Sequence, residues 1–239
     1  MTEAAPGTGF ESHVVEVRAH GRYLLRPALG AAAGILVGFH GYMESAEPHL
    51  DALATIPGSA SWNAVAVDAL HAFYARSSGS GRVVRGWLTS DLRSEAIADN
   101  VRYIGGVLDA VRARCGWRLP VVLLGYSQGA SMAWRAAVLA GHEIAALAAL
   151  AGDVPPELAE LPAPTPFPRR ALIARGADDN WYDAAKLDAD RARLAGRGIE
   201  LEALVFPGGH EWSDGFRGAV SRLLAEVAAQ AERDATATR

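Results

Sequence analysis

The stretch at residues 119–132 constrains the fold more than any other part of the chain. An apolar run at 121–124 leads directly into Gly-Tyr-Ser-Gln-Gly at 125–129, and an alanine-rich segment then continues to Gly141. The β-branched and leucine residues before the turn predict a buried strand, and the run after it predicts a helix. The pattern therefore predicts a sharp strand-to-helix turn with Ser127 at its corner.

The two glycines of this corner have a physical reason. A strand that turns straight into a helix strains the backbone of the central residue, and side chains two positions away would collide there. Gly125 and Gly129 avoid those collisions. The hydroxyl of Ser127 would stand above the sheet edge, where the free N–H groups and positive dipole end of the helix stabilise negative charge. We interpret the motif as a nucleophile elbow.

Strand-like apolar runs alternate with helical segments along the whole chain. The strands are expected at 34–39, 64–68, 121–124, 144–152, 170–175 and 201–206. The helices are expected near 48–53, 91–114, 128–141, 183–194 and 216–229. This alternation predicts an α/β fold with a mostly parallel, doubly wound sheet and the chemistry at the carboxyl ends of its strands. Residues 13–18 and 22–26 predict an antiparallel N-terminal hairpin at the sheet edge.

The length of 239 residues and the 50% hydrophobic composition suit a single core. We expect one domain at 12–230, a flexible N-terminal tail at 1–11 and a C-terminal tail at 231–239. The proline-rich connector at 155–168 is too short for a helical cap domain. A Gly- and Ser-rich loop at 73–81 is expected to be mobile and could border a substrate.

Composition also narrows the classes of partner and location. The net charge of −4 with no basic stripe speaks against nucleic acid, and no run of about 18 uncharged apolar residues predicts a membrane span. The first residues lack the pattern of a secretion signal, so a cytoplasmic location is expected. Cys115 is the single cysteine, and no Cys/His spacing suggests zinc, so neither a metal nor a cofactor is expected. The oligomeric state stays open.

A serine nucleophile needs a base, and the base needs an orienting acid. His210 follows the last predicted strand within Pro-Gly-Gly-His-Glu-Trp at 207–212, where the glycines let its ring reach the sheet edge. Asp178 and Asp179 follow the preceding strand, and Asp153 follows the strand before that. All three give the chain order Ser, Asp, His of α/β-hydrolase triads. We favour Asp179, then Asp178, then Asp153.

These motifs resemble the α/β-hydrolase superfamily, and within it the phospholipase/carboxylesterase-like branch that includes acyl-protein thioesterases. The resemblance spans about residues 13–229. Gly-Tyr-Ser-Gln-Gly at 125–129 matches the nucleophile segment of that branch, and His-Gly-Tyr at 40–42 matches its His-Gly-x turn. It implies an α/β-hydrolase fold without a cap domain. It also implies Ser127 as nucleophile, His210 as base, and Asp179, three residues after Gly176, as acid.

The resemblance further implies an oxyanion hole formed by the backbone N–H groups of Tyr42 and Gln128. The branch often continues its turn with Gly-Asp, whereas this chain has Met43-Glu44. We expect His40 to brace the turn rather than to react. Aromatic residues that follow predicted strands are candidates for an apolar pocket wall. They are Tyr42, Phe73, Tyr74, Trp181 and Trp212.

Together these features predict a serine hydrolase that cleaves small carboxylic esters of short to medium acyl chains through an acyl-serine intermediate. Acyl-thioesterase and lysophospholipase activities are alternatives on the same triad. A serine peptidase is a less favoured alternative. A non-catalytic small-molecule-binding module is also considered, because a fold alone does not fix a function. It agrees less well with the sequence, since all three triad residue types are present.

Overall fold

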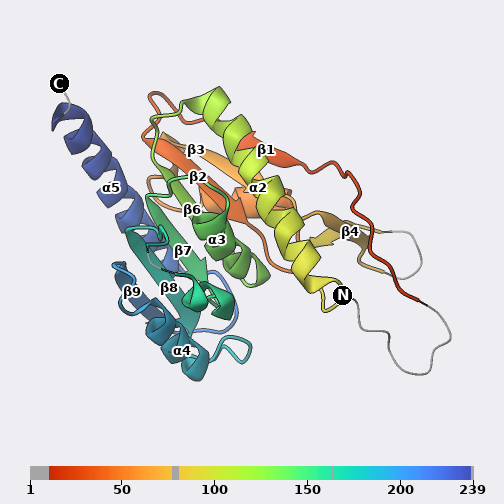
Figure 1. Ribbon diagram of the computed structural model, residues 1–239. Coiled ribbons are helices and arrows are strands. Elements are labelled where there is room, and N and C mark those ends of the chain that lie inside the picture. Colours follow the sequence, from red (N-terminus) through yellow and green to blue (C-terminus); the bar gives the residue numbers. More distant parts are fainter. Residues whose placement is uncertain (1–10, 77–80, 163, 238–239) are drawn as a thin grey trace.

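The computed structural model describes residues 11–76, 81–162 and 164–237. The expected N-terminal tail therefore lies outside the described residues except for Glu11, and so do residues 77–80 of the expected mobile loop. Within the described part, a seven-stranded sheet has the order β1-β3-β2-β6-β7-β8-β9, and β4 and β5 pair separately. Figure 1 shows the sheet at the centre of the molecule with helices on both sides.

The elements alternate as the sequence patterns predict. The strands are β1 (Tyr23–Arg26), β2 (Gly34–Phe39), β3 (Trp62–Val67), β4 (His71–Tyr74), β5 (Val83–Gly86), β6 (Val121–Tyr126), β7 (Ala146–Leu150), β8 (Arg170–Gly176) and β9 (Glu200–Phe206). The α-helices are α1 (Ala46–Ala54), α2 (Arg93–Cys115), α3 (Gln128–Leu139), α4 (Ala184–Leu194) and α5 (Asp214–Ala237). Two short 3₁₀ helices, η1 (Ser59–Ser61) and η2 (Pro156–Glu160), complete the set.

The sheet is parallel from β3 through β9, and β1 is antiparallel to β3. In the register, Phe39 pairs with both Val67 and Gly125, and Tyr126 pairs with Leu150. The carboxyl ends of these strands therefore meet at one edge, which is where Ser127 lies. Strands β2, β3 and β7 are buried along their whole length, as expected of strands covered on both faces.

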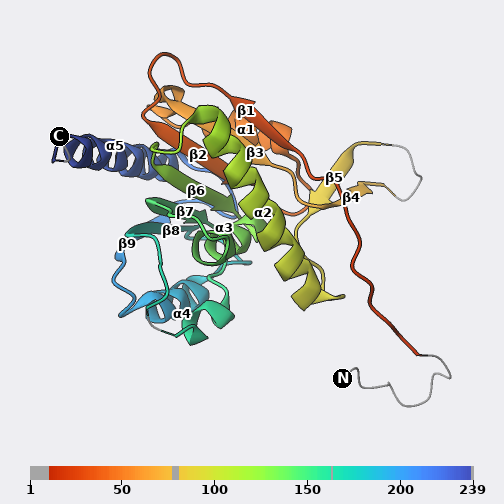
Figure 2. The same cartoon turned by 45° about the horizontal axis from the view of Figure 1, so that its top comes forward.

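Each face of the sheet has its own hydrophobic core. On one face, Leu108 of α2, Met132 of α3 and Leu187 of α4 pack against the sheet residues Val37 and Leu123. On the other face, α1 and α5 pack against the alternate residues of the same strands. Figures 1 and 2 show these two helical layers on opposite sides of the sheet. Because both faces are covered, polar chemistry is left to the sheet edge.

The N-terminal hairpin predicted at 13–26 does not form. Only its second arm is a strand, β1, whereas residues 11–22 have no strand structure. Val15 and Val17 are each 78% exposed, so their side chains bury little apolar surface. An arm paired only to an edge strand lacks the packing that stabilises a two-stranded unit. The antiparallel edge is therefore a single strand.

The first two residues of the loop predicted at 73–81 belong to a second small sheet, whereas residues 77–80 lie outside the described residues. These two residues end β4, which pairs antiparallel with β5, and Phe73 pairs with Val84. A further bridge joins Glu44 to Arg85, so the hairpin is attached to the turn that follows β2.

The closing helix is longer than the pattern predicts. It runs from Asp214 to Ala237, so residues 231–237, expected as a tail, are helical, and 238–239 lie outside the described residues. Apolar spacing ends near Val227, but alanine, glutamate and arginine beyond it are good helix formers that continue the helix without packing. The proline-rich connector at 155–168 holds only η2, and no cap domain is present in the described chain.

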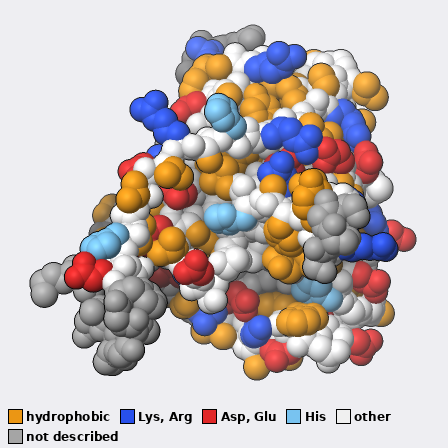
Figure 3. Space-filling view, turned by 90° about the vertical axis from the view of Figure 1, so that its right-hand side faces the viewer, with side chains coloured by type: hydrophobic (Ala, Val, Ile, Leu, Met, Phe, Trp, Pro, Cys, Tyr) orange, Lys and Arg blue, Asp and Glu red, His pale blue; other side chains and the backbone are white. Residues whose placement is uncertain are grey.

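The surface carries both signs of charge. On the face in Figure 3, basic and acidic side chains are interspersed with hydrophobic ones. Along the part of the chain that the structure describes, no helix is long and apolar enough to cross a membrane.

Candidate active site

Ser127 lies at the turn between β6 and α3, where the elbow motif places it. Its backbone has φ 53° and ψ −122°, a conformation that costs free energy for a residue with a side chain. The surrounding chain holds it there, since the Ser127 N–H donates to Leu150 O over 2.8 Å and Ala130 N donates to Ser127 O over 3.0 Å. The strained serine is the last residue before α3 begins at Gln128.

The glycines of the elbow are required by close contacts. A Cβ at Gly125 would lie 2.4 Å from Ala130 Cα, and one at Gly129 would lie 2.1 Å from Phe39 O. A third glycine, Gly152 after β7, faces Ser127 O in the same way, at 2.2 Å. All three contacts are with backbone or near-backbone atoms that cannot move aside. The turn therefore excludes any larger residue at these positions.

A hydrogen-bonded chain runs from Ser127 to Asp179. His210 Nε2 lies 2.8 Å from Ser127 Oγ, and His210 Nδ1 lies 2.9 Å from Asp179 Oδ2. Asp179 is 3% exposed, whereas the His210 side chain is 26% exposed. The second oxygen of the carboxylate, Oδ1, accepts the N–H groups of Trp181 and Tyr182 over 2.8 and 2.9 Å. These bonds fix the orientation of the carboxylate toward His210.

The structure separates the three candidate acids. Asp179 contacts His210, whereas Asp178 is exposed and only its backbone N–H is engaged, with Gly208 O. Asp153 is also exposed and lines the cleft beside Ser127. Neither carboxylate is hydrogen-bonded to the His210 imidazole within the described residues.

The backbone around His210 is held by its neighbours. Tyr126 OH donates to His210 O over 2.8 Å, and the two rings lie 5.4 Å apart. Burial raises the pKa of Tyr126 to about 12, so its hydroxyl keeps the proton that it donates. On the other side, a Cβ at Gly176 would lie 2.2 Å from Gly209 O. The acid loop and the histidine loop are therefore packed directly on each other.

Two backbone N–H groups are candidates for an oxyanion hole. The N–H of Gln128 belongs to the first turn of α3, which has no intrahelical partner for it. The Gln128 side chain points elsewhere: its Oε1 accepts Trp87 N over 2.7 Å and its Nε2 donates to Leu88 O over 2.7 Å. This amide therefore clamps the segment between β5 and α2 to the elbow, a role that no local sequence signal indicates.

The Tyr42 N–H lies in the turn after β2, which is fixed from two directions. Met43 N donates to Arg85 O over 2.9 Å, and Arg85 N donates to Glu44 O over 2.8 Å, which ties the turn to β5. From within, the Glu44 carboxylate accepts the Gly41 N–H over 2.8 Å. Met43 has φ 62°, the one positive value in this turn. Met43 and Glu44 thus belong to a rigid turn. They stand at the positions where the phospholipase/carboxylesterase-like branch often has Gly-Asp.

His40 braces this turn, and its two ring nitrogens bond to backbone groups of Gly41 and Ala69. It is fully buried, its Nδ1 donates to Gly41 O over 2.7 Å, and its Nε2 accepts Ala69 N over 3.1 Å. Burial lowers the pKa of His40, which keeps the ring neutral and suits one donor and one acceptor nitrogen. Trp87 Nε1 donates to His40 O from the other side.

Glu44 is a half-buried carboxyl that the sequence alone did not identify. Burial raises its pKa, while its bond with the Gly41 N–H and the nearby charges of Arg82 and His210 act in the opposite direction. It lines the cleft together with Ser127 and His210. The signal available in the sequence was the departure of Met43-Glu44 from Gly-Asp, but its meaning required the folded turn.

A cleft of about 710 Å³ opens onto Ser127 and His210. Tyr42 and Trp181 line it, as predicted, whereas Phe73, Tyr74 and Trp212 do not. Phe73 packs on the Tyr42 ring at 5.7 Å, and Trp212 packs against Tyr126 and Phe216.

The wall of this cleft is more polar than the expected apolar surface. Its charged residues are Glu44, Arg93, Arg135, Asp153, Lys186 and Arg193. The basic residues that α2, α3 and α4 contribute to this wall could not be predicted from the sequence, because no local pattern indicates that these three helices meet at the cleft.

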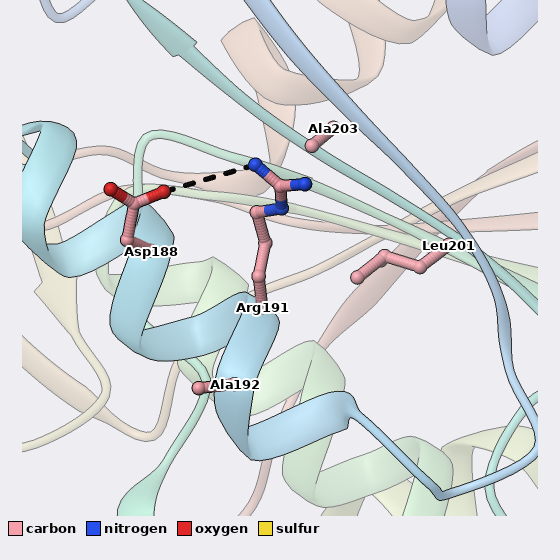
Figure 4. Close-up of a pocket in the computed structure, with 5 residues that line it drawn as sticks. All are labelled: Asp188, Arg191, Ala192, Leu201 and Ala203. Atoms are coloured by element: carbon pink, nitrogen blue, oxygen red, sulfur yellow. Dashed lines mark ion pairs between the residues drawn. The ribbon is translucent and has the colours of Figure 1, made fainter.

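A second cavity, of about 630 Å³, lies between α4 and β9. It is lined by Asp188, Arg191, Ala192, Leu201 and Ala203, and Figure 4 shows the ion pair of Asp188 and Arg191 at its edge. It contains none of the residues of the Ser127 site. Within the described chain, no group of three or more His, Cys, Asp or Glu residues is arranged to hold a metal ion.

Comparisons by sequence give no match, either to a protein-family model or to a curated protein. Comparison of structures gives many matches. The esterase PE8 aligns with 24% identity and a TM-score of 0.68, over 87% of this chain and 100% of PE8. The Bacillus cereus carboxylesterase aligns with 15% identity and a TM-score of 0.66, over 87% and 95%. Zea mays acyl-protein thioesterase 2 aligns with 16% identity and a TM-score of 0.64, over 87% and 100%.

These alignments span most of the chain and nearly the whole of each solved structure. The chain therefore has the α/β-hydrolase fold that its motifs resemble. Because a shared fold does not fix a function, the chemistry has to be argued from the site itself.

Proposed function

We propose that the protein is a serine hydrolase that cleaves carboxylic esters through an acyl-serine intermediate. The observation that carries the proposal is the continuous chain Ser127 Oγ, His210 and Asp179, with contacts of 2.8 and 2.9 Å at a strained elbow. This geometry matches the requirements of nucleophile, base and orienting acid. The names of the structural neighbours, an esterase, a carboxylesterase and an acyl-protein thioesterase, support the same reaction class.

In the acylation step, His210 Nε2 accepts the proton of Ser127 Oγ as the oxygen attacks the ester carbonyl. Asp179 holds Nδ1–H and stabilises the imidazolium that forms. The carbonyl oxygen becomes an oxyanion, which the N–H groups of Tyr42 and Gln128 would stabilise. The intermediate collapses to the acyl-serine, and His210 gives its proton to the leaving alcohol.

In the deacylation step, His210 removes a proton from water, which attacks the acyl-serine. The second tetrahedral intermediate collapses to the free acid, and the proton returns to Ser127. The chemistry needs only these side chains and water, so we propose no metal or cofactor. The small-molecule ester is the only partner that this reaction requires.

The substrates are proposed to be esters of short to medium acyl chains. The described chain has no cap domain over the cleft, and only two of the five aromatic candidates line it. A cleft of about 710 Å³ is within the usual size range of small-molecule sites. Each buried methylene adds about 0.8 kcal/mol to binding until the cleft is filled. Thioesters and lysophospholipids are alternatives for the same triad.

Labelling with a fluorophosphonate tests the nucleophile. We expect one adduct on the wild-type protein, mapped to Ser127 by peptide mass spectrometry, and none on Ser127→Ala, which should also be inactive. Ser131 lies one helical turn further on and is the matched control, so Ser131→Ala should still be labelled. An adduct on another serine in active protein would reject the assignment.

A substrate panel tests the reaction class. We expect kcat/KM on nitrophenyl esters to rise from acetyl to butyryl or hexanoyl and then to fall, without a jump at the micelle threshold. Thioesters, lysophospholipids and peptides complete the panel. A profile that still climbs at palmitoyl, or a thioester preference at equal acyl chain, would favour the alternatives.

A further inference from the structure

The basic residues of the cleft fall into two groups. On the α4 side, Lys186 Nζ donates to Trp181 O over 2.6 Å, and Arg193 pairs with the buried Asp190 at 2.5 Å. Both cations are thus engaged: Lys186 with the loop before α4, and Arg193 with Asp190 within α4. Arg93 at the start of α2 and Arg135 in α3 form the second group.

Arg135 is placed by the spacing of α3. Ser127, Ser131 and Arg135 are four residues apart, so they follow one face of the helix at intervals of about 6 Å. Arg135 Nη1 donates to Ser131 Oγ over 3.3 Å, which brings the guanidinium back toward the nucleophile. The Arg135 side chain is only 1% exposed, and it pairs with Glu157 at 2.5 Å. It is a fixed, buried charge.

Arg93 lies near this buried charge without a partner of its own. The side chain is exposed and lines the cleft, and it has no hydrogen bond or ion pair with any residue in the described ranges. Burial lowers the pKa of Arg135, Glu157 raises it, and the charge of Arg93 lowers it further. Glu157 pairs with Arg135 alone, so Arg93, Arg135 and Glu157 together carry a net charge of +1, and the unpaired charge is that of Arg93.

In the described part of the chain, the other acidic residues of the cleft, Glu44 and Asp153, form no ion pair with Arg93 or Arg135. Glu44 accepts the Gly41 N–H in the turn after β2. Asp153 follows β7 and precedes Val154, whose N–H is held by Asp190 on the α4 side. The cationic end formed by Arg93, Ser131 and Arg135 is thus open to an anion from outside the chain.

We propose that this cationic end binds a carboxylate of the substrate, so that the preferred esters carry an ionised carboxyl group a few atoms from the scissile carbonyl. The inference rests on the proposed ester hydrolysis and specifies its substrate class. Arg93 supplies the uncompensated charge and the free hydrogen-bond donors. The donors of Arg135 are held by Glu157 and Ser131, so this buried residue contributes its fixed charge rather than a direct contact. The carboxylate belongs either to the acyl chain or to the alcohol.

Paired substrates test the proposal. Mono-4-nitrophenyl adipate places the carboxylate on the acyl chain, and 4-nitrophenyl hexanoate is its neutral counterpart. The butyrate ester of 4-hydroxybenzoate places the carboxylate on the alcohol, with the butyrate ester of methyl 4-hydroxybenzoate as its counterpart. We expect kcat/KM to favour the anionic member of at least one pair, and the preferred pair identifies which side of the ester carries the anion.

Arg93→Gln should lower the ratio of anionic to neutral kcat/KM about fivefold, the effect of one ion pair of about 1 kcal/mol. Arg93→Lys should restore most of the ratio, since it restores the charge. Arg102→Gln removes an exposed arginine of the same helix outside the cleft and is the matched control. A ratio that is the same in wild type, Arg93→Gln and Arg102→Gln would overturn the proposal.

Binding of free adipate separates this inference from the proposed reaction. Isothermal titration of adipate into Ser127→Ala should give an affinity about fivefold weaker when Arg93→Gln is added, and weaker again at high salt. This result would support the carboxylate site even if no ester were cleaved. Equal affinities in the two variants would reject the site even if esters were cleaved.

Discussion

At the residue scale, the site depends on a few polar atoms that are held by buried backbone. Ser127 is strained, Asp179 is buried, and His210 lies between them with part of its ring open to the cleft. Each is oriented by groups that do not react: Tyr182 N holds Asp179, and Tyr126 OH holds the backbone of His210. Precise orientation of this kind is what makes a weak serine nucleophile reactive.

We expect Asp179→Asn to lower kcat by about 10⁴, because an amide can no longer hold His210 in the required tautomer. Asp178→Asn is the matched control in the same loop, and Asp153→Asn tests the acid that lines the cleft. Both should retain activity close to that of wild type. Steady-state kinetics on one nitrophenyl ester measures kcat for the three variants. A loss of kcat in Asp178→Asn or Asp153→Asn alone would assign the role of orienting acid to that residue instead.

Glu44 is expected to act as a positioning residue for the oxyanion turn. Glu44→Ala leaves the Gly41 N–H without its acceptor and should lower kcat by up to about 10², the loss that follows removal of one oxyanion donor. Glu44→Gln keeps an acceptor oxygen and should recover most of kcat. If both variants lost activity equally while KM and the urea midpoint stayed constant, the carboxylate charge would be required instead.

At the element scale, the elbow is a tight junction between β6, α3 and the neighbouring β2. The backbone of Phe39 at the end of β2 lies directly against Gly129 in the first turn of α3. Gly125 is in contact with the backbone of Ala130, one turn further along. Packing at such a junction leaves no room for relaxation, because the obstructing atoms belong to the backbone of other elements.

Gly129→Ala should therefore destabilise the protein strongly, since its Cβ would lie 2.1 Å from Phe39 O. Gly106→Ala is the matched control, because a Cβ there meets nothing within 4 Å in the middle of α2. Alanine in a helix is favoured over glycine by roughly 0.5–1 kcal/mol, so this variant should be slightly more stable than wild type. Urea unfolding measures the midpoint of each variant. Similar midpoints for Gly129→Ala and Gly106→Ala would contradict the tight packing at Gly129.

At the scale of the whole molecule, stability is coupled to pH through buried histidines. His49 of α1 is 2% exposed, and its Nε2 lacks a hydrogen-bond partner within the described residues. Burial lowers its pKa to about 3, and the nearby His40 adds to the effect. Burial also lowers the pKa of His40 itself. Both rings are thus neutral in the folded protein at pH values where the unfolded chain is protonated.

The sign of the pH dependence follows from these shifts. A histidine whose folded pKa is depressed contributes stability that is fully present above its unfolded value of about 6.5 and is lost as the pH falls. Between that value and about pH 3, His49 should lower the free energy of unfolding by about 1.4 kcal/mol per pH unit. Urea unfolding at pH 7.5, 5.5 and 4.5 measures this slope. His49→Leu should show a shallower slope than wild type, and identical slopes would show that His49 is not the source.

The sequence by itself determined the alternation of strands and helices, the position of Ser127 at the elbow, and the placement of His210 after the last strand. These features follow from local patterns: apolar periodicity, and glycines at a turn that no larger residue can occupy. A mostly parallel, doubly wound sheet could be inferred from them because parallel strands joined by helices have few compatible arrangements. The α/β-hydrolase fold was implied by the resemblance of the motifs at 40–42 and 125–129.

Only the tertiary structure decided which aspartate contacts His210, what the cleft wall consists of, and how the turn after β2 is held. Asp178 and Asp179 are adjacent in the chain and differ only in the direction that the loop gives to each side chain. Glu44, Arg93 and Arg135 belong to three separate elements, and nothing in their local sequence indicates a shared cleft. Contacts between elements distant in the chain depend on how the helices pack on the sheet, which no short pattern encodes.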